Sequence, residues 1–155
     1  MRLVIQRTTQ ARVLVDDKII AEIGTGMLVL AGIARSDTQV EADYLARRVP
    51  ELRIFTDTSG PDKTGKMNLT LRQVEGSVLI VPNFTLYGDC SKGRRPGFDM
   101  AARPEAARPL FDYLVAAFIN NGAATKVGVF GADMKVELVN DGPVTFVLDS
   151  LPTQL

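Results

Sequence analysis

Alternating or continuous apolar positions, which are the pattern of β-strands, dominate the chain up to residue 33. Segments of this kind are separated by short polar or glycine-containing breaks, and they cover residues 2–7, 11–15, 18–23 and 26–33. Asp16-Asp17 lies between two of them and has the composition of a tight hairpin turn. The pattern therefore predicts a series of short strands joined by tight turns.

The hydrophobic period then changes to that of a helix. Apolar residues recur at helical spacing from Val40 to Val49, after the capping pair Ser36-Asp37 and before Pro50, which ends the pattern. A further strand is expected from Leu52 to Phe55. The residues from Thr56 to Lys66 include Ser-Gly-Pro and a second glycine, and so they predict an exposed loop.

Two extended segments are expected in the middle of the chain, Leu69–Val74 and Ser77–Leu86. The second is apolar almost without interruption. A short continuous apolar run of this kind is typical of a strand that is buried on both faces.

The C-terminal part predicts one more helix and three strands. The helix is expected to begin near Pro104 and to end at Asn120-Asn121-Gly122, and Pro109 inside it should kink it or delay its start. The strands are expected near Thr125–Val129, Met134–Val139 and Val144–Leu148. Gly142-Pro143 separates the last two and predicts a tight turn between them. Together the elements predict an α+β fold with a curled antiparallel, barrel-like sheet and two main helices.

Composition agrees with one globular domain spanning residues 1–155. Hydrophobic residues make up 46% of the chain and the mean hydropathy is +0.08. No apolar run approaches the roughly 18–20 residues that a membrane span needs. The first residues become polar too soon for a secretory signal, and the single cysteine, Cys90, suits a reducing compartment. We therefore expect a cytoplasmic protein without membrane association.

The sequence contains no histidine. This excludes Ser-His-Asp and Cys-His catalytic systems within the chain, as well as every metal site with a histidine ligand. Any chemistry must use backbone dipoles, hydroxyls, carboxylates or groups that the substrate brings. We expect no metal and no cofactor.

The charges are balanced, with 18 basic and 18 acidic residues. The chain therefore has no overall field that would hold a long nucleic acid. One local basic cluster is formed by Lys92, Arg94 and Arg95, and Arg47-Arg48 forms another. Either cluster could be an ordinary solvated surface, but the first closely follows Phe84-Thr85 and could bind phosphates at the mouth of a site.

The string Asn140-Asp141-Gly142-Pro143-Val144-Thr145-Phe146 resembles the signature of the D-aminoacyl-tRNA deacylase family. Other segments resemble that family in the same order: Val4–Arg7, Gly24–Leu30, Arg53–Asp57 with Gly65–Asn68, Ser77–Leu86, Lys92–Phe98 and Gly131–Met134. One departure is clear. Pro82-Asn83 stands where the family usually has Ser-Gln, and Asn83 is one methylene shorter than glutamine.

The resemblance implies an enzyme that hydrolyses D-aminoacyl-tRNA, and also glycyl-tRNA, to free amino acid and tRNA. In this family a Gly-cis-Pro pair, here Gly142-Pro143, has backbone carbonyls that face the α-carbon of the aminoacyl group and exclude L-substrates. The pair belongs to the partner subunit's site, which implies a homodimer. Arg7 would brace this turn by hydrogen-bonding its carbonyls.

The segment Asn83-Phe84-Thr85 is the expected catalytic region. The backbone amides of Phe84 and Thr85 could stabilise the oxyanion of an ester under attack. The Thr85 hydroxyl is either a nucleophile or a positioning group, and no base for it is evident in the sequence. An ester at the tRNA 3′ end has a neighbouring 2′-hydroxyl, and we expect this group to assist hydrolysis.

Phe130 and Met134 are candidates for stacking on the terminal adenine of tRNA, although both could equally be core side chains. Two alternatives to the main hypothesis stay open. One is a related editing deacylase that tolerates small L-residues, which the Pro82-Asn83 departure keeps possible. The other is a non-catalytic module that binds RNA ends.

Overall fold

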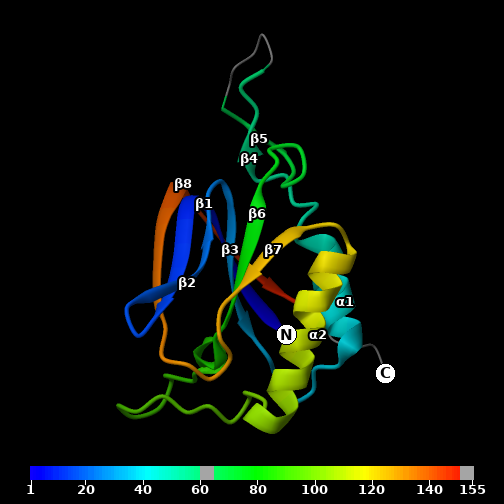
Figure 1. Ribbon diagram of the computed structural model, residues 1–155. Helices are drawn as coiled ribbons and strands as arrows, with labels where there is room; N and C mark the ends of the chain where they lie inside the picture. The colour runs from blue at the N-terminus through cyan, green and yellow to red at the C-terminus, as the bar shows by residue number, and fades with distance from the viewer. Residues whose placement is uncertain (60–64, 151–155) are drawn as a thin grey trace.

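The computed structural model describes residues 1–59 and 65–150 (Figure 1). Six strands form one sheet, in which the path β2-β1-β3-β6-β7 links five of them and β8 pairs with β1 off this path. These strands are β1 (Arg2–Val15), β2 (Lys18–Ile23), β3 (Gly26–Gly32), β6 (Ser77–Pro82), β7 (Ala124–Val127) and β8 (Lys135–Asp149). The remaining elements are α1 (Gln39–Arg48), β4 (Phe55–Thr56), β5 (Met67–Leu69), the 3-10 helix η1 (Phe84–Tyr87) and α2 (Pro104–Asn120).

The predicted α+β fold with a curled, barrel-like sheet and two main helices is confirmed. The sheet is mixed, however. β1 is antiparallel to β2, β3 and β8, whereas β3, β6 and β7 run parallel to one another. Parallel neighbours need long crossover connections. The connection from β3 to β6 contains α1 and that from β6 to β7 contains α2, and both helices pack together on one side of the sheet (Figure 1).

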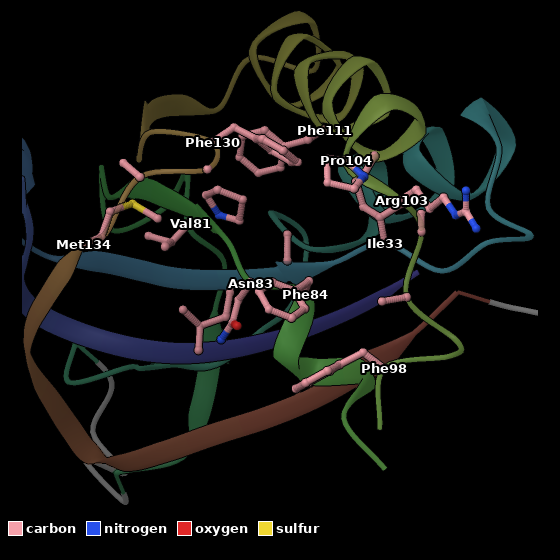
Figure 2. A pocket seen from close by; sticks show the side chains of 18 of the residues that line it. Ile33, Val81, Asn83, Phe84, Phe98, Arg103, Pro104, Phe111, Phe130 and Met134 are labelled. Atoms are coloured by element: carbon pink, nitrogen blue, oxygen red, sulfur yellow. The ribbon is translucent and has the colours of Figure 1, made fainter. Parts of the chain in front are cut away.

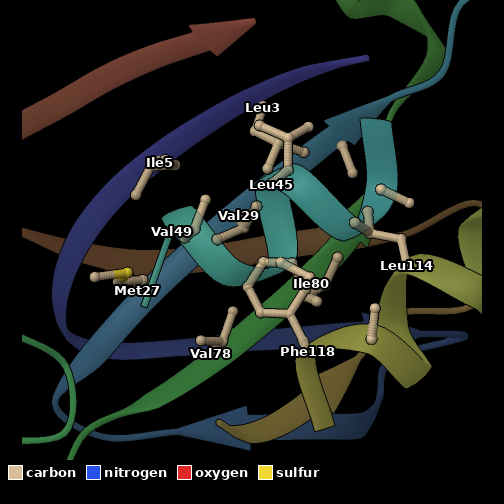
Figure 3. Close-up of a cluster of buried hydrophobic side chains, with 14 of the residues drawn as sticks. Leu3, Ile5, Met27, Val29, Leu45, Val49, Val78, Ile80, Leu114 and Phe118 are labelled. Atoms are coloured by element: carbon tan, nitrogen blue, oxygen red, sulfur yellow. The ribbon is translucent and has the colours of Figure 1, made fainter. Parts of the chain in front are cut away.

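The core has two parts because β3 and β6 are buried on both faces. Met27, Val29, Val78 and Ile80 belong to a large cluster that packs against α1 and α2 (Figure 3). The alternate residues of the same strands, Leu28, Leu79 and Val81, belong to a second cluster with residues of β1 and β2. The prediction that the run after Ser77 is buried on both faces is therefore confirmed for residues 78–81.

The first two predicted strands form one continuous strand. Residues 8–10 were expected to interrupt them, but β1 runs from Arg2 to Val15. Its first half pairs with β3, its second half pairs with β2, and β8 pairs along nearly its whole length. Thr8 pairs with both β3 and β8, and Gln10 pairs with Val139 of β8, so backbone pairing continues the strand through these polar residues. The hydrophobic pattern alone does not show this pairing.

The Gly142-Pro143 segment is not the hairpin turn that the sequence predicted. β8 continues through it and stays antiparallel to β1 on both sides, with Gln6 opposite Thr145 and Thr8 opposite Asn140. Between these pairs β1 has one residue, Arg7, and β8 has four, residues 141–144. The segment is thus a wide bulge of a single strand, and its Gly142-Pro143 peptide bond is cis.

The first helix begins later than predicted. Thr38, and not Ser36-Asp37, is its N-cap, and Thr38 forms a capping box with Glu41. Asp37 is used elsewhere, because its carboxylate accepts a hydrogen bond from the Ala34 amide at 2.6 Å. The second helix was predicted correctly. It begins at Pro104, so Pro109 does not delay its start.

Three predicted strands differ from the structure. Only Phe55 of the segment Leu52–Phe55 lies in a strand. Most of Leu69–Val74 forms turns, stabilised by mutual hydrogen bonds between Thr70 and Gln73. The segment Ser77–Leu86 leaves the sheet after Pro82.

The predicted loop from Thr56 to Lys66 lies partly outside the described residues. Of its ends, Thr56 belongs to β4, and Ser59 and Lys66 are exposed. Among the residues that the structure describes, no helix is long and apolar enough to cross a membrane.

Candidate functional site

A pocket of about 670 Å³ opens beside the ends of β3 and β6. Four structural regions meet there: the end of β6 with the start of η1, the segment before α2, the first turns of α2, and the segment before β8 (Figure 2). Predicted site residues from distant parts of the sequence line it together, namely Asn83, Phe84, Phe130 and Met134. The volume lies within the range of about 300–1,000 Å³ that is usual for small-molecule sites.

Asn83 is the N-cap of η1 and lies directly after the end of β6. Its side-chain oxygen accepts a hydrogen bond from the Thr85 amide at 3.2 Å and another from the Thr85 hydroxyl at 2.5 Å. This caps η1 and turns the chain out of the sheet. The Thr85 amide, which the sequence suggests as an oxyanion donor, thus already has an acceptor in Asn83, and its role with substrate stays a prediction. The Phe84 amide is the first of η1, and such amides have no acceptor within their own helix.

Phe84 and Phe98 form the aromatic wall at the mouth of the pocket. Their rings meet edge to face with centroids 5.0 Å apart, although 59% of Phe84 and 38% of Phe98 is solvent-exposed. Large exposed aromatic surface beside a cavity is typical of a binding site. Phe98 was not singled out in the sequence, because a lone phenylalanine after a basic loop carries no distinguishing pattern.

Phe130 and Met134 line the pocket and also contact the core. The Phe130 ring lies 5.9 Å from that of Phe111, between centroids, and packs against the large core cluster. Met134 packs against the second cluster, and its sulfur accepts a hydrogen bond from the Val129 amide at 3.3 Å. Each side chain is therefore held by the core and also borders the cavity, while stacking on the terminal adenine stays a prediction.

Arg7 lies under the bulge of β8 and is almost fully buried. Its Nε donates to the carbonyl oxygen of Asp141 at 3.2 Å and lies 3.0 Å from the Asp141 carboxylate. Its Nη1 donates to the carbonyl oxygen of Ile54 at 2.7 Å and to the hydroxyl of Thr56 at 3.3 Å. The expected bond from Arg7 to a carbonyl of the turn is present. Arg7 thus connects the bulge to β4.

The bulge is not part of the pocket of its own chain. Gly142 and Pro143 are exposed, and neither these residues nor Arg7 is among the described residues that line the cavity. Gly142 has a φ of 124°, and a Cβ built on it would lie 2.7 Å from Val144 and 3.1 Å from Arg7. Both the backbone conformation and the close neighbours require glycine there.

The predicted basic cluster lies on an exposed loop. Mutual backbone hydrogen bonds between Asp89 and Gly97, at 2.7 and 2.9 Å, close the base of this loop. Lys92, Arg94 and Arg95 lie between these two residues, and none of them lines the pocket. The arginines that do line it are Arg35 and Arg103. They are isolated and far apart in the chain, so no sequence pattern distinguishes them.

Tyr87, the last residue of η1, is anchored to β1. The Arg2 guanidinium lies 5.6 Å from the ring centroid of Tyr87 and donates to the Leu86 carbonyl at 3.3 Å. Arg2 also pairs with Asp149 of β8 at 2.7 Å. Burial, together with the negative charges of Asp37 and Asp149, raises the pKa of Tyr87 to about 12. The phenol is therefore a hydrogen-bond donor at neutral pH and does not act as a base.

Within residues 1–59 and 65–150, no group of three or more Cys, Asp or Glu side chains forms a candidate metal site. Cys90 is free and exposed on the basic loop.

The sequence model of the D-Tyr-tRNA(Tyr) deacylase family matches residues 4–149. The chain belongs to this family. It is 51% identical over 150 residues to the D-aminoacyl-tRNA deacylase of Geobacter sulfurreducens, covering 97% of this chain and 95% of the relative. It is 52% identical over 149 residues to the D-aminoacyl-tRNA deacylase of Pelobacter propionicus, covering 96% and 99% respectively.

Solved structures show the same fold. A c-Myc DNA unwinding element binding protein superposes with a TM-score of 0.89 at 35% identity, covering 98% of this chain and all of that one. A probable eukaryotic D-amino acid tRNA deacylase superposes with a TM-score of 0.80 at 20% identity, covering 96% of this chain and 98% of its own. The latter likeness concerns the fold alone.

Proposed function

We propose that the protein hydrolyses the ester bond of D-aminoacyl-tRNA, and also of glycyl-tRNA, releasing free amino acid and tRNA in the cytoplasm. Membership of the deacylase family supports the reaction class. The observation that carries the proposal within this chain is the pocket itself. It gathers Asn83, Phe84, Phe130 and Met134 around one cavity, although they come from two separate segments of the sequence.

The terminal adenosine of tRNA would enter this pocket with its base between Phe130 and Met134. Aromatic and thioether surfaces are suited to the face of a base. The ester carbonyl would then lie at the start of η1, where the Phe84 amide can donate to the developing oxyanion. The Thr85 amide would join it only by leaving the Asn83 oxygen, which it contacts at 3.2 Å.

Thr85 positions the substrate in this mechanism and does not attack it. Its hydroxyl proton is donated to Asn83 at 2.5 Å, and a carboxamide oxygen is too weak a base to remove that proton. An aminoacyl ester is already activated and has a neighbouring 2′-hydroxyl on the ribose. Positioning and oxyanion stabilisation, with assistance from that 2′-hydroxyl, are sufficient for hydrolysis.

Gly142 and Pro143 would select the chirality of the substrate through backbone atoms. The bulge of β8 is exposed and lies outside the pocket of its own chain, which supports its insertion into the site of a second subunit in a homodimer. Backbone carbonyls would accept hydrogen bonds from the α-ammonium, and an L side chain would collide with the backbone. Arg7 holds the bulge in place through the Asp141 carbonyl.

The test is a comparison of D-alanyl-tRNA and L-alanyl-tRNA as substrates of the purified protein. Fast release of D-alanine with L-alanyl-tRNA left intact supports the proposal. Hydrolysis of both would favour the L-tolerant editing deacylase, and binding without hydrolysis of either would favour the RNA-end binding module.

A second experiment tests the dimer with a mixture of two variants, each inactive alone. Gly142→Trp blocks the inserted bulge, and Phe84→Asp alters the pocket. If each site uses both subunits, the mixed dimer regains one intact site and part of the activity.

A further inference from the structure

Two arginines stand out in a pocket that is otherwise mostly apolar. Arg35 and Arg103 both line the cavity. In the described part of the chain, neither guanidinium takes part in a hydrogen bond or an ion pair. Cations that border a binding cavity without a partner are available to an anionic ligand.

The fold brings these two residues together by direct backbone contacts. The Arg35 amide donates to the Met100 carbonyl at 3.1 Å, and the Ala102 amide donates to the Ile33 carbonyl at 2.9 Å. Ala34 and Ala101 form an isolated β-bridge between the same two segments. The backbone at residues 33–35 is therefore fixed against residues 100–102, directly before Arg103.

Neither arginine side chain is needed for this arrangement. Arg103 occupies the N-cap of α2 but makes no side-chain capping bond, and the helix is started by the Arg103 carbonyl and by Pro104. Pro104 and Ala107 also line the pocket, so the positively polarised end of α2 lies at the same wall. Glu105, in the first turn of α2, is exposed and does not line the cavity.

We infer that Arg35 and Arg103 bind the phosphate on the 5′ side of the terminal adenosine in the acceptor end of tRNA. This inference rests on the proposed function. The chemistry of the substrate leaves few alternatives: the carboxyl group of the amino acid is esterified and neutral, and its α-ammonium would be repelled by arginine. The anion that every such substrate carries is a phosphodiester of the RNA.

The position of Arg103 agrees with this assignment. Met134 lies at one end of the pocket and Arg103, beside Pro104, lies at the other (Figure 2). A base held at the Phe130 and Met134 end would leave the phosphate directed toward the cationic end. Arg35 and Arg103 thus bind the phosphate end of the nucleotide, away from the ester.

The experiment compares two probes that cannot be hydrolysed: D-alanine joined by an amide bond to 3′-amino-3′-deoxyadenosine, with and without a 5′-phosphate. The wild-type protein should bind the phosphorylated probe about tenfold more tightly, as expected of charge-assisted hydrogen bonds at a partly exposed site. The double variant Arg35→Gln with Arg103→Gln should bind both probes equally, and its affinity for the phosphate-free probe should match that of the wild type. Arg108→Gln is the control, because Arg108 is exposed on the same helix and does not line the pocket.

Equal binding of both probes by the wild type would overturn the inference, and so would a double variant that keeps the phosphate preference. Arg35→Lys with Arg103→Lys should keep part of the preference, which separates charge from damage to the fold. With D-alanyl-tRNA as substrate, the double glutamine variant should have a higher KM than the wild type and little change in kcat.

Failure of the wild type to hydrolyse D-alanyl-tRNA would count against the proposed function alone, since the binding comparison needs no catalysis. If AMP competes with the probes but the KM for tRNA is unchanged in the variant, the site is for a free nucleotide and the inference fails.

Discussion

The side-chain oxygen of Asn83 accepts hydrogen bonds from both the amide and the hydroxyl of Thr85, at 3.2 and 2.5 Å. The pair fixes the first turn of η1 beside the pocket. It also directs the proton of the Thr85 hydroxyl toward the amide oxygen of Asn83, which is too weak a base to remove it. Asn83 therefore orients Thr85 without activating it as a nucleophile.

From this relationship we predict that Thr85→Ala keeps substantial deacylase activity, within about tenfold of the wild type, the usual size of a lost positioning contact. Single-turnover release of D-alanine from D-alanyl-tRNA is the measurement. Thr85→Val is a matched control of similar shape that also lacks the hydroxyl. A rate equal to that of the uncatalysed reaction, or an aminoacyl adduct on Thr85 in the mass spectrum, would show that Thr85 is the nucleophile.

Arg7 gives a second prediction, because its guanidinium contacts two carbonyl groups from different parts of the fold. Arg7→Lys cannot reach both Asp141 and Ile54 with the same geometry, so buried acceptors lose donors. The expected cost is about 1–3 kcal/mol in the free energy of unfolding. Denaturant titration measures it, and the ratio of D- to L-alanyl-tRNA hydrolysis should fall in the same variant.

Arg12→Lys is the control for that experiment. Arg12 lies on the same strand and pairs with Glu137 at 2.6 Å, but 36% of its side chain is exposed. Exposed ion pairs contribute about 0–1 kcal/mol. Equal destabilisation by the two substitutions would show that the buried contacts of Arg7 do not hold the bulge.

The elements that the sequence predicts well are those defined by a local residue pattern, without reference to a neighbouring strand. β2, β3 and α2 have strong periodicity with clear ends, and Asp16 and Asp17 adopt the left-handed conformation of a tight hairpin turn, with φ of 49° and 59°. The site signature was recognised as a string of residues. Its shape was not, because a four-residue bulge opposite Arg7 is defined by pairing with β1 and not by any local pattern.

The pocket shows the same limit. Phe130 and Met134 could be selected because they belong to a recognisable segment, and the structure places both on the cavity. Arg35 and Arg103 are single arginines in ordinary surroundings, and only the backbone bridge between Ala34 and Ala101 brings them to one wall. Lys92, Arg94 and Arg95, by contrast, are close together in the sequence and form a recognisable cluster, although they lie outside the pocket.

A third prediction concerns the junction of β3 and β6. A Cβ at Gly26 would lie 1.9 Å from the Ser77 carbonyl oxygen, closer than two non-bonded atoms can approach. Gly26→Ala must therefore push β3 and β6 apart. We expect loss of several kcal/mol of stability, on the order of 3 kcal/mol or more, or insoluble protein. Gly24→Ala is the control, because its added methyl would lie 4.0 Å from the nearest atom, the Thr9 carbonyl oxygen. A Gly26→Ala protein with wild-type thermal stability would contradict this packing.

The fourth prediction is that hydrolysis of D-alanyl-tRNA does not depend on a bound metal. It follows from the lack of histidine in the chain and from a mechanism that uses backbone amides and the 2′-hydroxyl of the substrate. Protein dialysed against a chelator should keep its full rate. Loss of activity that zinc restores would contradict the mechanism.

The last prediction concerns Tyr87 at high pH. Its phenol is partly buried beside Asp37 and Asp149, and its pKa is raised to about 12, whereas a tyrosine in an unfolded chain titrates near 10. The folded state therefore retains this proton where the unfolded state has lost it. The resulting stabilisation is complete below about pH 10 and is lost as the pH rises toward about 12.

Between about pH 10 and 12 the wild type should lose more stability than Tyr87→Phe, in which the other titrating groups are unchanged. Tyrosinate absorbance of the folded protein should show a smaller change near pH 12 in Tyr87→Phe than in the wild type. Tyr113, whose pKa is also raised by its hydrogen bond to Asp43, is present in both proteins. If the absorbance change near pH 12 is equally large in the two proteins, or if both proteins lose stability in parallel, Tyr87 is not the group held protonated by its surroundings.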